Sequence, residues 1–308
     1  MNEKTSKNQK IVPYLWYEGQ AEEAANFYVD AFSSVGSPSS IGHVSRYGEA
    51  TEDVSGIAAG TVMTVDFQLA GQNFIALNGG PEFNFTPAIS FFVACDTAEE
   101  VDALYEKLSE GGKTLMPLDA YPFSERFAWI NDKYGVSWQL LLGSMAQKIT
   151  PAFLFVGEQF GKGEEAMNLY VSLFEDSATG DIARYGPEDE EQEGKIAHAT
   201  FTLTGQEFVV MDSGMDHDFT FTEATSLFVS CENQEEVDYF WNKLTADGGE
   251  ESVCGWLKDK YGVSWQIVPT RLMELLSDED PAKAERVTEA MLQMKKIDVA
   301  QLEAAYEG

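Results

Sequence analysis

The chain has 308 residues, of which 44% are hydrophobic and 12% aromatic, so it is long enough to build two domains with a core each. Its 52 acidic and 20 basic residues give a formal net charge of -32, which repels phosphate backbones and anionic lipid and excludes nucleic acid and membrane surfaces as expected partners. The acid excess is explained by solubility or, alternatively, by attraction of a cationic ligand.

The three cysteines, Cys95, Cys231 and Cys254, cannot all pair, and no CxxC motif is present. This usage is typical of a reduced, intracellular protein. The N-terminal segment is polar and lacks the apolar stretch of a signal peptide, and no apolar run has membrane-spanning length. We therefore expect a cytoplasmic protein.

The first part of the chain predicts a strand, a helix and three further strands. Apolar residues recur at helical spacing from Gln20 to Phe32, and residues 61–69 alternate strictly before a turn at Gly71. Pro13 limits the first strand to an edge or a strand start. The elements are expected at residues 11–17 (strand), 20–32 (helix), 41–47 (strand), 61–69 (strand) and 74–77 (strand).

The same order then follows a second time. Residues 97–100, Thr-Ala-Glu-Glu, form a capping box, and the Gly-Gly pair at 111–112 ends the predicted helix. The expected elements are a strand at 88–94, this helix, and strands near 113–115, 126–131 and 137–142.

The whole series is duplicated. The segment Lys-Tyr-Gly-Val-Ser-Trp-Gln at 133–139 occurs again, letter for letter, at 260–266. The copies are offset by 136 residues at Cys95 and Cys231 but by 127 residues at this segment, so the first copy has nine additional residues, which we place within 117–125.

We predict an α+β fold of two tandem domains, each built from paired βαβββ modules, followed by helices. The domains are expected at residues 1–147 and 148–270, with a C-terminal helical extension at 271–308 that docks on the second copy. In that extension Asp280 and Pro281 predict a helix start, Asp298 predicts a cap of a last short helix, and methionines at helical spacing indicate packing rather than a binding site.

Three segments carry a resemblance to a known family: Gly19-Gln-Ala-Glu-Glu-Ala24, Ala76-Leu-Asn-Gly-Gly-Pro-Glu82 and the stretch from Cys254 to Pro269. With the tail around 290–298, they resemble the PhnB-like group, which is labelled as 3-demethylubiquinone-9 3-methyltransferase domains. That group lies within the vicinal oxygen chelate superfamily, which also contains glyoxalases, extradiol dioxygenases and antibiotic-resistance proteins. The resemblance implies the glyoxalase fold with cup-shaped sites but no particular activity.

In metal enzymes of this superfamily, the last strand of a module pair supplies a glutamate and an earlier strand supplies a histidine. Here those positions hold Gln139 and Gln266 on the last strands, and Ser90 and Ser226 on the earlier ones; the first strands offer Tyr14 and Phe153. Because a divalent cation needs carboxylates, imidazoles or thiolates, we expect no metal and no other cofactor, with a divalent metal as the alternative.

His198 and Asp212 are the candidate catalytic residues. His198 lies on the polar side of an alternating strand, opposite Ala199 and Phe201, and corresponds to Thr64 in the first copy. Asp212 ends the next strand, so the two could form an acid/base or ligand pair. The alternative is a strand histidine with an ordinary hydrogen-bonded partner.

Six further residues are expected to line the ligand site: Trp16, Asn78, Trp138, Gln139, Trp265 and Gln266. Core packing explains the two tryptophans of the repeated segment equally well. The Gly-rich stretch at 78–81 follows a hairpin and contains a proline, so it does not match the strand–loop–helix unit of common S-adenosylmethionine enzymes.

We therefore expect a protein that binds a small molecule in a cup-shaped site. The alternatives are a metal-dependent lyase or isomerase, the methyltransferase that the family label implies, and a structural or interaction protein. The chain is expected as a monomer, whose two domains pair within the chain, or as a homodimer.

Overall fold

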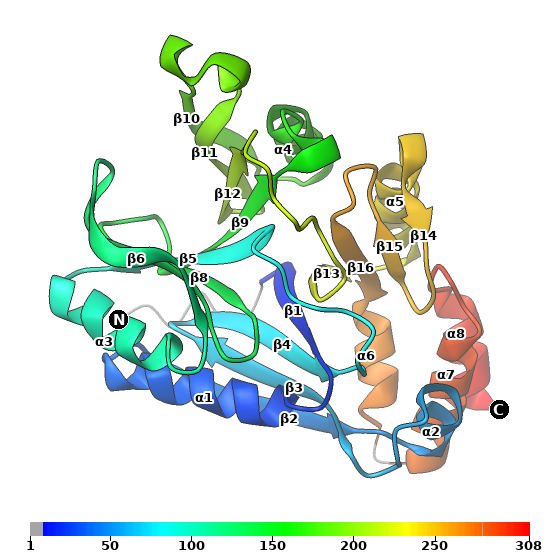
Figure 1. Cartoon of the computed structure of the whole chain (residues 1–308). Coiled ribbons are helices and arrows are strands. Elements are labelled where there is room, and N and C mark those ends of the chain that lie inside the picture. The colour runs from blue at the N-terminus through cyan, green and yellow to red at the C-terminus, as the bar shows by residue number, and fades with distance from the viewer. Residues whose placement is uncertain (1–8, 279) are drawn as a thin grey trace.

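The computed structural model describes residues 9–278 and 280–308. Two eight-stranded mixed sheets form the framework, with the helices of the four modules packed on one face of each (Figure 1). The first sheet has the order β14 (Glu250–Glu251), β15 (Trp256–Lys258), β16 (Ser264–Pro269), β13 (Thr225–Cys231), β1 (Ile11–Tyr17), β4 (Gln72–Asn78), β3 (Val62–Leu69) and β2 (Ser40–Arg46). The second has the order β10 (Ala178–Arg184), β11 (Ile196–Leu203), β12 (Gln206–Asp212), β9 (Ile149–Phe155), β5 (Ile89–Cys95), β8 (Ser137–Leu142), β7 (Ser124–Asn131) and β6 (Lys113–Tyr121).

The helices follow the expected positions within each module. They are α1 (Ala21–Ser34), α2 (Glu49–Ser55), α3 (Ala98–Leu108), α4 (Gly163–Leu173), α5 (Gln234–Leu244), α6 (Thr270–Leu276), α7 (Pro281–Leu292) and α8 (Val299–Glu307), with short 3-10 turns at Gly157–Gln159, Pro187–Gln192 and Ala246–Gly248. The predicted order of strand, helix and three strands is confirmed in all four modules. The sequence did not predict α2, whose residues read as a loop of Gly, Glu and Asp.

Each sheet joins modules from different copies of the repeat. The central contact of the first sheet is the antiparallel pair β1–β13, in which Tyr14 lies opposite Ser226. The corresponding contact of the second sheet is β5–β9, with Ser90 opposite Ala152. The strands of one copy alone therefore complete neither sheet.

Unlike the sheets, each of the two large hydrophobic cores comes mostly from one copy of the repeat. One core packs α1 and α3 between the two sheets and is built almost entirely from residues of the first copy, including Phe67, Phe91 and Trp138. The other packs α4 and α5 and comes almost entirely from the second copy. Because sheets and cores divide the chain differently, the boundaries at residues 147 and 270 stay a proposal based on the repeat.

Ion pairs across the copies reinforce this arrangement. Lys10, just before β1, contacts Glu236 at the start of α5, with the two atoms 2.5 Å apart. Lys148, just before β9, contacts Glu100 on α3 at the same distance. Each glutamate also accepts a hydrogen bond from the backbone just before its own helix, so the pairs tie the first strand of one copy to a helix start of the other.

The C-terminal helices have their own small core. Asp280 accepts a hydrogen bond from Ala282 and Asp298 from Gln301, so both act as the N-caps that the sequence predicts. Val287 and Leu302 are fully buried and pack with Val268, at the end of β16. The extension also reaches the first copy, because the Glu285 carboxylate accepts a hydrogen bond from the backbone of Ala50 on α2.

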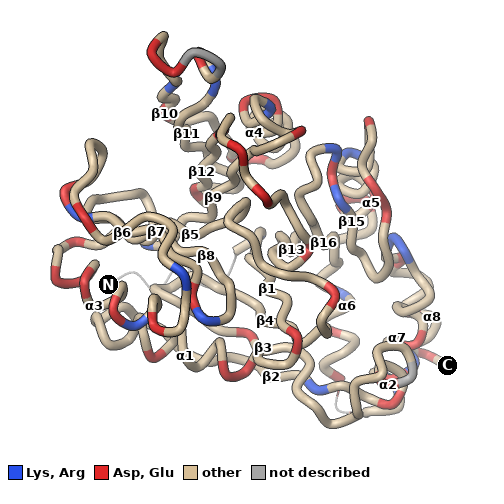
Figure 2. Tube along the Cα trace, in the orientation of Figure 1, with Lys and Arg blue, Asp and Glu red and all other residues tan. Residues whose placement is uncertain are grey.

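The nine additional residues of the first copy lie in the β6–β7 hairpin, whose strands have nine and eight residues. The strands of its counterpart, the β14–β15 hairpin, have only two and three residues. In the described residues no helix is long and apolar enough to cross a membrane. Asp and Glu residues are scattered over helices and loops of both copies rather than gathered at one place (Figure 2).

Candidate functional site

The face of each sheet that is turned away from α1, α3, α4 and α5 is called its cup face. At the centre of the cup face of the second sheet, Gln139 on β8 donates a hydrogen bond to Ser90 on β5, with a distance of 2.9 Å. In the first sheet, Gln266 on β16 donates to Ser226 on β13 at the same distance. All four side chains are buried. The structure thus brings together the glutamines and serines that the sequence singled out, as two equivalent neutral pairs.

The residue next to each Gln–Ser pair comes from β1 in the first sheet and from β9 in the second, and it differs between the two sheets. Strand alternation places Tyr14 on the cup face of the first sheet, and its counterpart on the second is Ala152, not the predicted Phe153. The expectation for Phe153 is wrong because this ring lies one residue further on, on the helix side, within the core of the second copy.

Aromatic rings cover the centre of the first cup face. The Tyr14 ring stacks against Phe228 at a centroid distance of 6.3 Å and meets Trp256 edge-on at 5.8 Å. Burial, with the nearby Asp66 carboxylate, raises the pKa of the Tyr14 hydroxyl well above its usual value. The phenol is therefore neutral and can donate or accept a hydrogen bond.

Beside this cluster the first cup face has a cavity of about 370 Å³. Asp66 on β3 is its acidic group, and burial raises the pKa of that carboxyl while the nearby His43 opposes the shift. No hydrogen-bond or ion-pair partner is found for the Asp66 side chain within residues 9–278 and 280–308. The cavity is lined by Val12, Ser40, Gly42, Asp66, Phe67, Gln68, Asn73, Phe74 and Ile75.

The second cup face is apolar by comparison. Phe92, Ala152 and Val209 are buried there, and partly buried side chains such as Trp129 and Met211 pack on them. His198 lies at the margin of this cluster, with its ring edge-on to Phe92 at a centroid distance of 6.0 Å. Burial lowers the pKa of His198, which favours the neutral imidazole.

The predicted pair of His198 and Asp212 does not form. Asp212 lies on the helix side of β12, where its carboxylate accepts hydrogen bonds from the backbone of Gly161 and Gly163 at the start of α4 and of Ile196. These bonds occupy both oxygens and fix the start of the helix, while His198 is on the opposite face. Asp212 is thus a structural cap, and its carboxylate does not face His198.

Asn78, the counterpart of Asp212, has the same structural task. Its side chain accepts a hydrogen bond from Ala21 at the start of α1 and donates one to the Val62 carbonyl. The expectation that it lines a cup is wrong, because the polar end of this strand is needed to satisfy the first turn of the helix.

Trp138 and Trp265 also lie in the cores rather than on the cup faces. Both are fully buried, and each indole donates a hydrogen bond to the aspartate that precedes its repeated segment, Asp132 or Asp259. The same carboxylates accept bonds from a helix tyrosine and from two backbone N–H groups: Tyr28, Tyr134 and Val136 in the first copy, and Tyr170, Tyr261 and Val263 in the second. The repeated sequence is thus explained by one polar anchor in each core.

The comparisons agree with this architecture. The sequence profile of the family described as 3-demethylubiquinone-9 3-methyltransferase matches residues 9–141 and again 147–268. The chain belongs to this family. No curated protein matches it.

Two solved structures are similar to this family member. A Bacillus cereus protein described as a putative 3-demethylubiquinone-9 3-methyltransferase, PhnB protein, is 47% identical, with 44% of this chain and all of that chain covered and a TM-score of 0.39. A mutant of glyoxalase I from Zea mays is 10% identical, covers 84% of this chain and 94% of its own length, and has a TM-score of 0.51. The maize enzyme supports the glyoxalase fold and nothing further.

A divalent metal ion does not fit the residues at the centre of either cup face. Each centre holds a glutamine amide and a serine hydroxyl that bond to each other, next to Tyr14 in the first sheet and Ala152 in the second. Among the residues that the structure describes, no group of three or more His, Cys, Asp or Glu could hold a metal ion. Neutral amide and hydroxyl ligands alone do not compensate a divalent cation for its lost hydration.

Sequence reasoning missed Asp66 and Trp256 as cup-face residues. Asp66 occupies the polar phase of the alternating strand β3, so the same period that placed His198 correctly could have found it. Trp256 lies opposite Gln266 across β15 and β16, and β15 is too short to show a period. His217 has a partner that the sequence did not predict, the Ser213 hydroxyl at 2.8 Å.

Proposed function

We propose that this protein binds a small organic molecule, without a metal ion, in the cavity on the cup face of the first sheet. The observation that carries this proposal is the Asp66 carboxylate, which is partly buried in the cavity wall and has no hydrogen-bond or ion-pair partner in the described part of the chain. A carboxylate in that position is stabilised by a ligand that donates an N–H or O–H hydrogen bond. Val12 and Ile75 offer apolar contacts for the rest of such a molecule.

Specificity would come from the contrast between one acidic acceptor and its apolar surroundings. The neighbouring Gln68 amide bonds to the Asn73 side chain at 3.2 Å, so its orientation is fixed. The neutral Tyr14 hydroxyl lies close enough to Asp66 for the two groups to interact electrostatically. A small polar metabolite with an apolar side fits this chemistry.

A screen of thermal unfolding against a metabolite panel tests the proposal, with a chelator present throughout. The panel includes S-adenosylmethionine, which tests the methyltransferase alternative, and a parallel screen with added divalent metal tests the lyase or isomerase alternative. A ligand at a hundred times its Kd stabilises the fold by about 2.7 kcal/mol, which raises Tm measurably.

The decisive variant is Asp66→Thr, which copies the counterpart residue Thr200 of the second sheet. We expect a hit from the panel to lose at least about tenfold in affinity, since a charge-assisted hydrogen bond contributes about 1.5–3 kcal/mol. Asp181→Asn, on the exposed strand β10, is the control for loss of one negative charge. Equal affinity of wild type and Asp66→Thr, or binding only with metal, would contradict the proposal; no hit at all would favour an interaction protein.

We propose that the chain works as a monomer in the cytoplasm, with homodimer as the alternative. The central contacts of both sheets are satisfied within the chain, which supports the monomer. The free thiols Cys95 and Cys231 are buried, and burial raises the pKa of each to about 12, consistent with small packing residues in a reducing compartment. Light scattering after gel filtration distinguishes monomer from dimer.

A further inference from the structure

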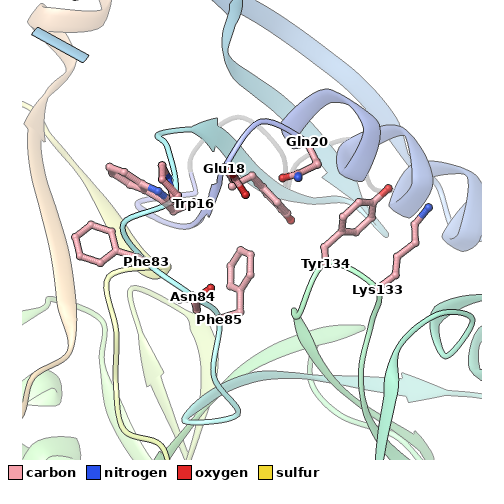
Figure 3. Close-up of a pocket in the computed structure, with 10 residues that line it drawn as sticks. Trp16, Glu18, Gln20, Phe83, Asn84, Phe85, Lys133 and Tyr134 are labelled. Carbon is pink, nitrogen blue, oxygen red and sulfur yellow. The ribbon is translucent and has the colours of Figure 1, made fainter. Parts of the chain in front are cut away.

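A second cavity, of about 280 Å³, lies at the end of β1, at the margin of the first cup face (Figure 3). Trp16, which the sequence singled out, shares the strand face of Tyr14 and meets Trp256 edge-on at 5.9 Å. Its walls are two aromatic pairs, each made of one ring from β1 and one from the loop that follows β4. Trp16 meets Phe83 at a centroid distance of 5.0 Å, and Tyr17 meets Phe85 at 5.2 Å. In Figure 3, Glu18 lies above the space between these walls.

The position of the Trp16 ring is fixed on two sides. Its indole N–H donates a hydrogen bond to the Gly80 carbonyl at 2.8 Å. The backbone of Gly79 passes so close to the ring that a Cβ there would lie 2.2 Å from it, so the contact requires glycine. The wall is therefore formed before any ligand arrives, which lowers the entropic cost of binding.

The charges of the cavity favour a cation. Glu18 lines it and has no ion-pair or hydrogen-bond partner among the described residues. The basic residue of the lining, Lys133, pairs with Glu23 at 3.2 Å and lies 4.9 Å from the ring centre of Phe27, so its charge is already compensated. The net charge of -32 adds a long-range attraction for small cations.

The second copy keeps one of these aromatic pairs, Phe155 and Phe221 at a centroid distance of 5.1 Å, but lacks the tryptophan and the carboxylate. The counterpart of Trp16 is Leu154, which is 5% exposed. The residue after Phe155 is Val156, buried at 2% exposure, where the first copy has the exposed Glu18 after Tyr17. The duplication has thus kept the fold and given only one copy an aromatic wall beside a free carboxylate.

We propose that this cavity binds a small organic cation, of the quaternary or tertiary ammonium class, between the aromatic walls and beside Glu18. A cation over the face of tryptophan or another aromatic ring is stabilised by about 0.5–2 kcal/mol, and tryptophan is the best of these rings. Such a ligand needs no hydrogen-bond donor, which separates it from the ligand of the Asp66 cavity. The proposal stands independently of the function proposed above.

The test uses choline and its neutral isostere 3,3-dimethyl-1-butanol as probes, in which a quaternary nitrogen is replaced by carbon. Binding to the full chain is measured by saturation-transfer NMR on the probe methyl groups and by titration at low salt. We expect choline to bind at least about fivefold more tightly than the isostere, which corresponds to a cation–π contribution near 1 kcal/mol. Equal binding of the two probes, or no binding of choline, overturns the proposal.

Two variants locate the site, and a third serves as the charge control. Glu18→Gln should weaken choline binding roughly fivefold, and Trp16→Leu, which copies Leu154, by roughly fivefold to thirtyfold. Glu22→Gln removes one exposed charge from the neighbouring first turn of α1 and should leave the affinity unchanged. An equal effect of Glu18→Gln and Glu22→Gln would show general electrostatic attraction and contradict the site. Asp66→Thr should leave choline binding unchanged, so failure here and failure of the Asp66 cavity are distinguishable.

Discussion

The two cup faces have the same framework and different chemistry. Each has a central Gln–Ser pair at 2.9 Å on equivalent strands. Around that pair, the first face has Tyr14 and a cavity with the Asp66 carboxylate in its wall, whereas the second has Ala152 and an apolar cluster. The helix sides of the sheets did not diverge in this way, because the Asp132 and Asp259 anchors have the same partners in both copies. After duplication, the cores kept these polar anchors, whereas the cup faces acquired different residues.

The surroundings of the faces differ as well. The C-terminal helices pack against Val268 and Phe228 of the first sheet. The second sheet has the long β6–β7 hairpin, whose tip residue Phe123 is 63% exposed. The following predictions compare these equivalent places, from the largest expected effect to the smallest.

The C-terminal helices should behave as part of the core, and the hairpin tip as surface. Leu302→Ala deletes a fully buried side chain and should lower the free energy of unfolding by about 2–5 kcal/mol. Phe123→Ala, at an exposed position, should change it by less than about 1 kcal/mol. Urea unfolding of both variants measures the difference. Equal losses would mean that the hairpin covers the second sheet as firmly as the helices cover the first.

The two buried aspartates should give the same pH dependence. Burial raises the pKa of Asp132 from 3.8 to about 6, although hydrogen bonds from Trp138 and Tyr28 oppose the shift. The folded state therefore binds this proton more tightly than the unfolded state, so its contribution to stability is fully present below pH 4 and is lost as the pH rises through 6. Asp259 shifts in the same direction.

Asp132→Asn removes this titration. The stability of the wild type relative to this variant should fall by about 1–2 kcal/mol between pH 5 and pH 7.5, measured by urea unfolding at each pH. Asp259→Asn is the matched variant in the second core and should give a change of the same sign. Opposite signs would break the equivalence of the two cores.

The ion pairs between the copies should differ slightly in strength. The Glu100 side chain is 13% exposed in its pair with Lys148, whereas Glu236 is 33% exposed in its pair with Lys10. Double-mutant cycles with Lys→Met and Glu→Gln should give a coupling of about 1 kcal/mol for the first pair and about 0.5 kcal/mol for the second. A stronger coupling at Lys10 would reverse this order.

Local patterns predicted the elements because each pattern has a physical period. The alternation of residues 61–69 predicted β3, and Thr97 accepts the hydrogen bond expected of an N-cap from Glu100. Alternation along β12 would have placed Asp212 with Phe208 and Val210 on the helix side of the sheet, which is where it lies. The prediction instead paired Asp212 with His198 because the two residues lie on neighbouring strands. When the alternation of both strands is taken into account, the two residues are predicted on opposite faces of the sheet.

The pairing of strands from different copies had no local signal. Ile11 lies opposite Val229, and nothing in the residues between them indicates that contact. The roles of Trp138 and Trp265 were equally hidden, because an indole in an apolar strand is suited to either face. The decisive partner, a buried aspartate six residues earlier, is visible only once the turn is folded.

The exchange of modules between the sheets also sets the order of events during synthesis. On the ribosome, β13 emerges about two hundred residues after β1, its partner on one side, since Ile11 pairs with Val229. Likewise, one edge of β5 stays unpaired until β9 has been synthesised. Until then the nascent chain has open strand edges, which are prone to pair with the wrong neighbours. Completion of the first sheet must await the translation of β16, about 250 residues after β1.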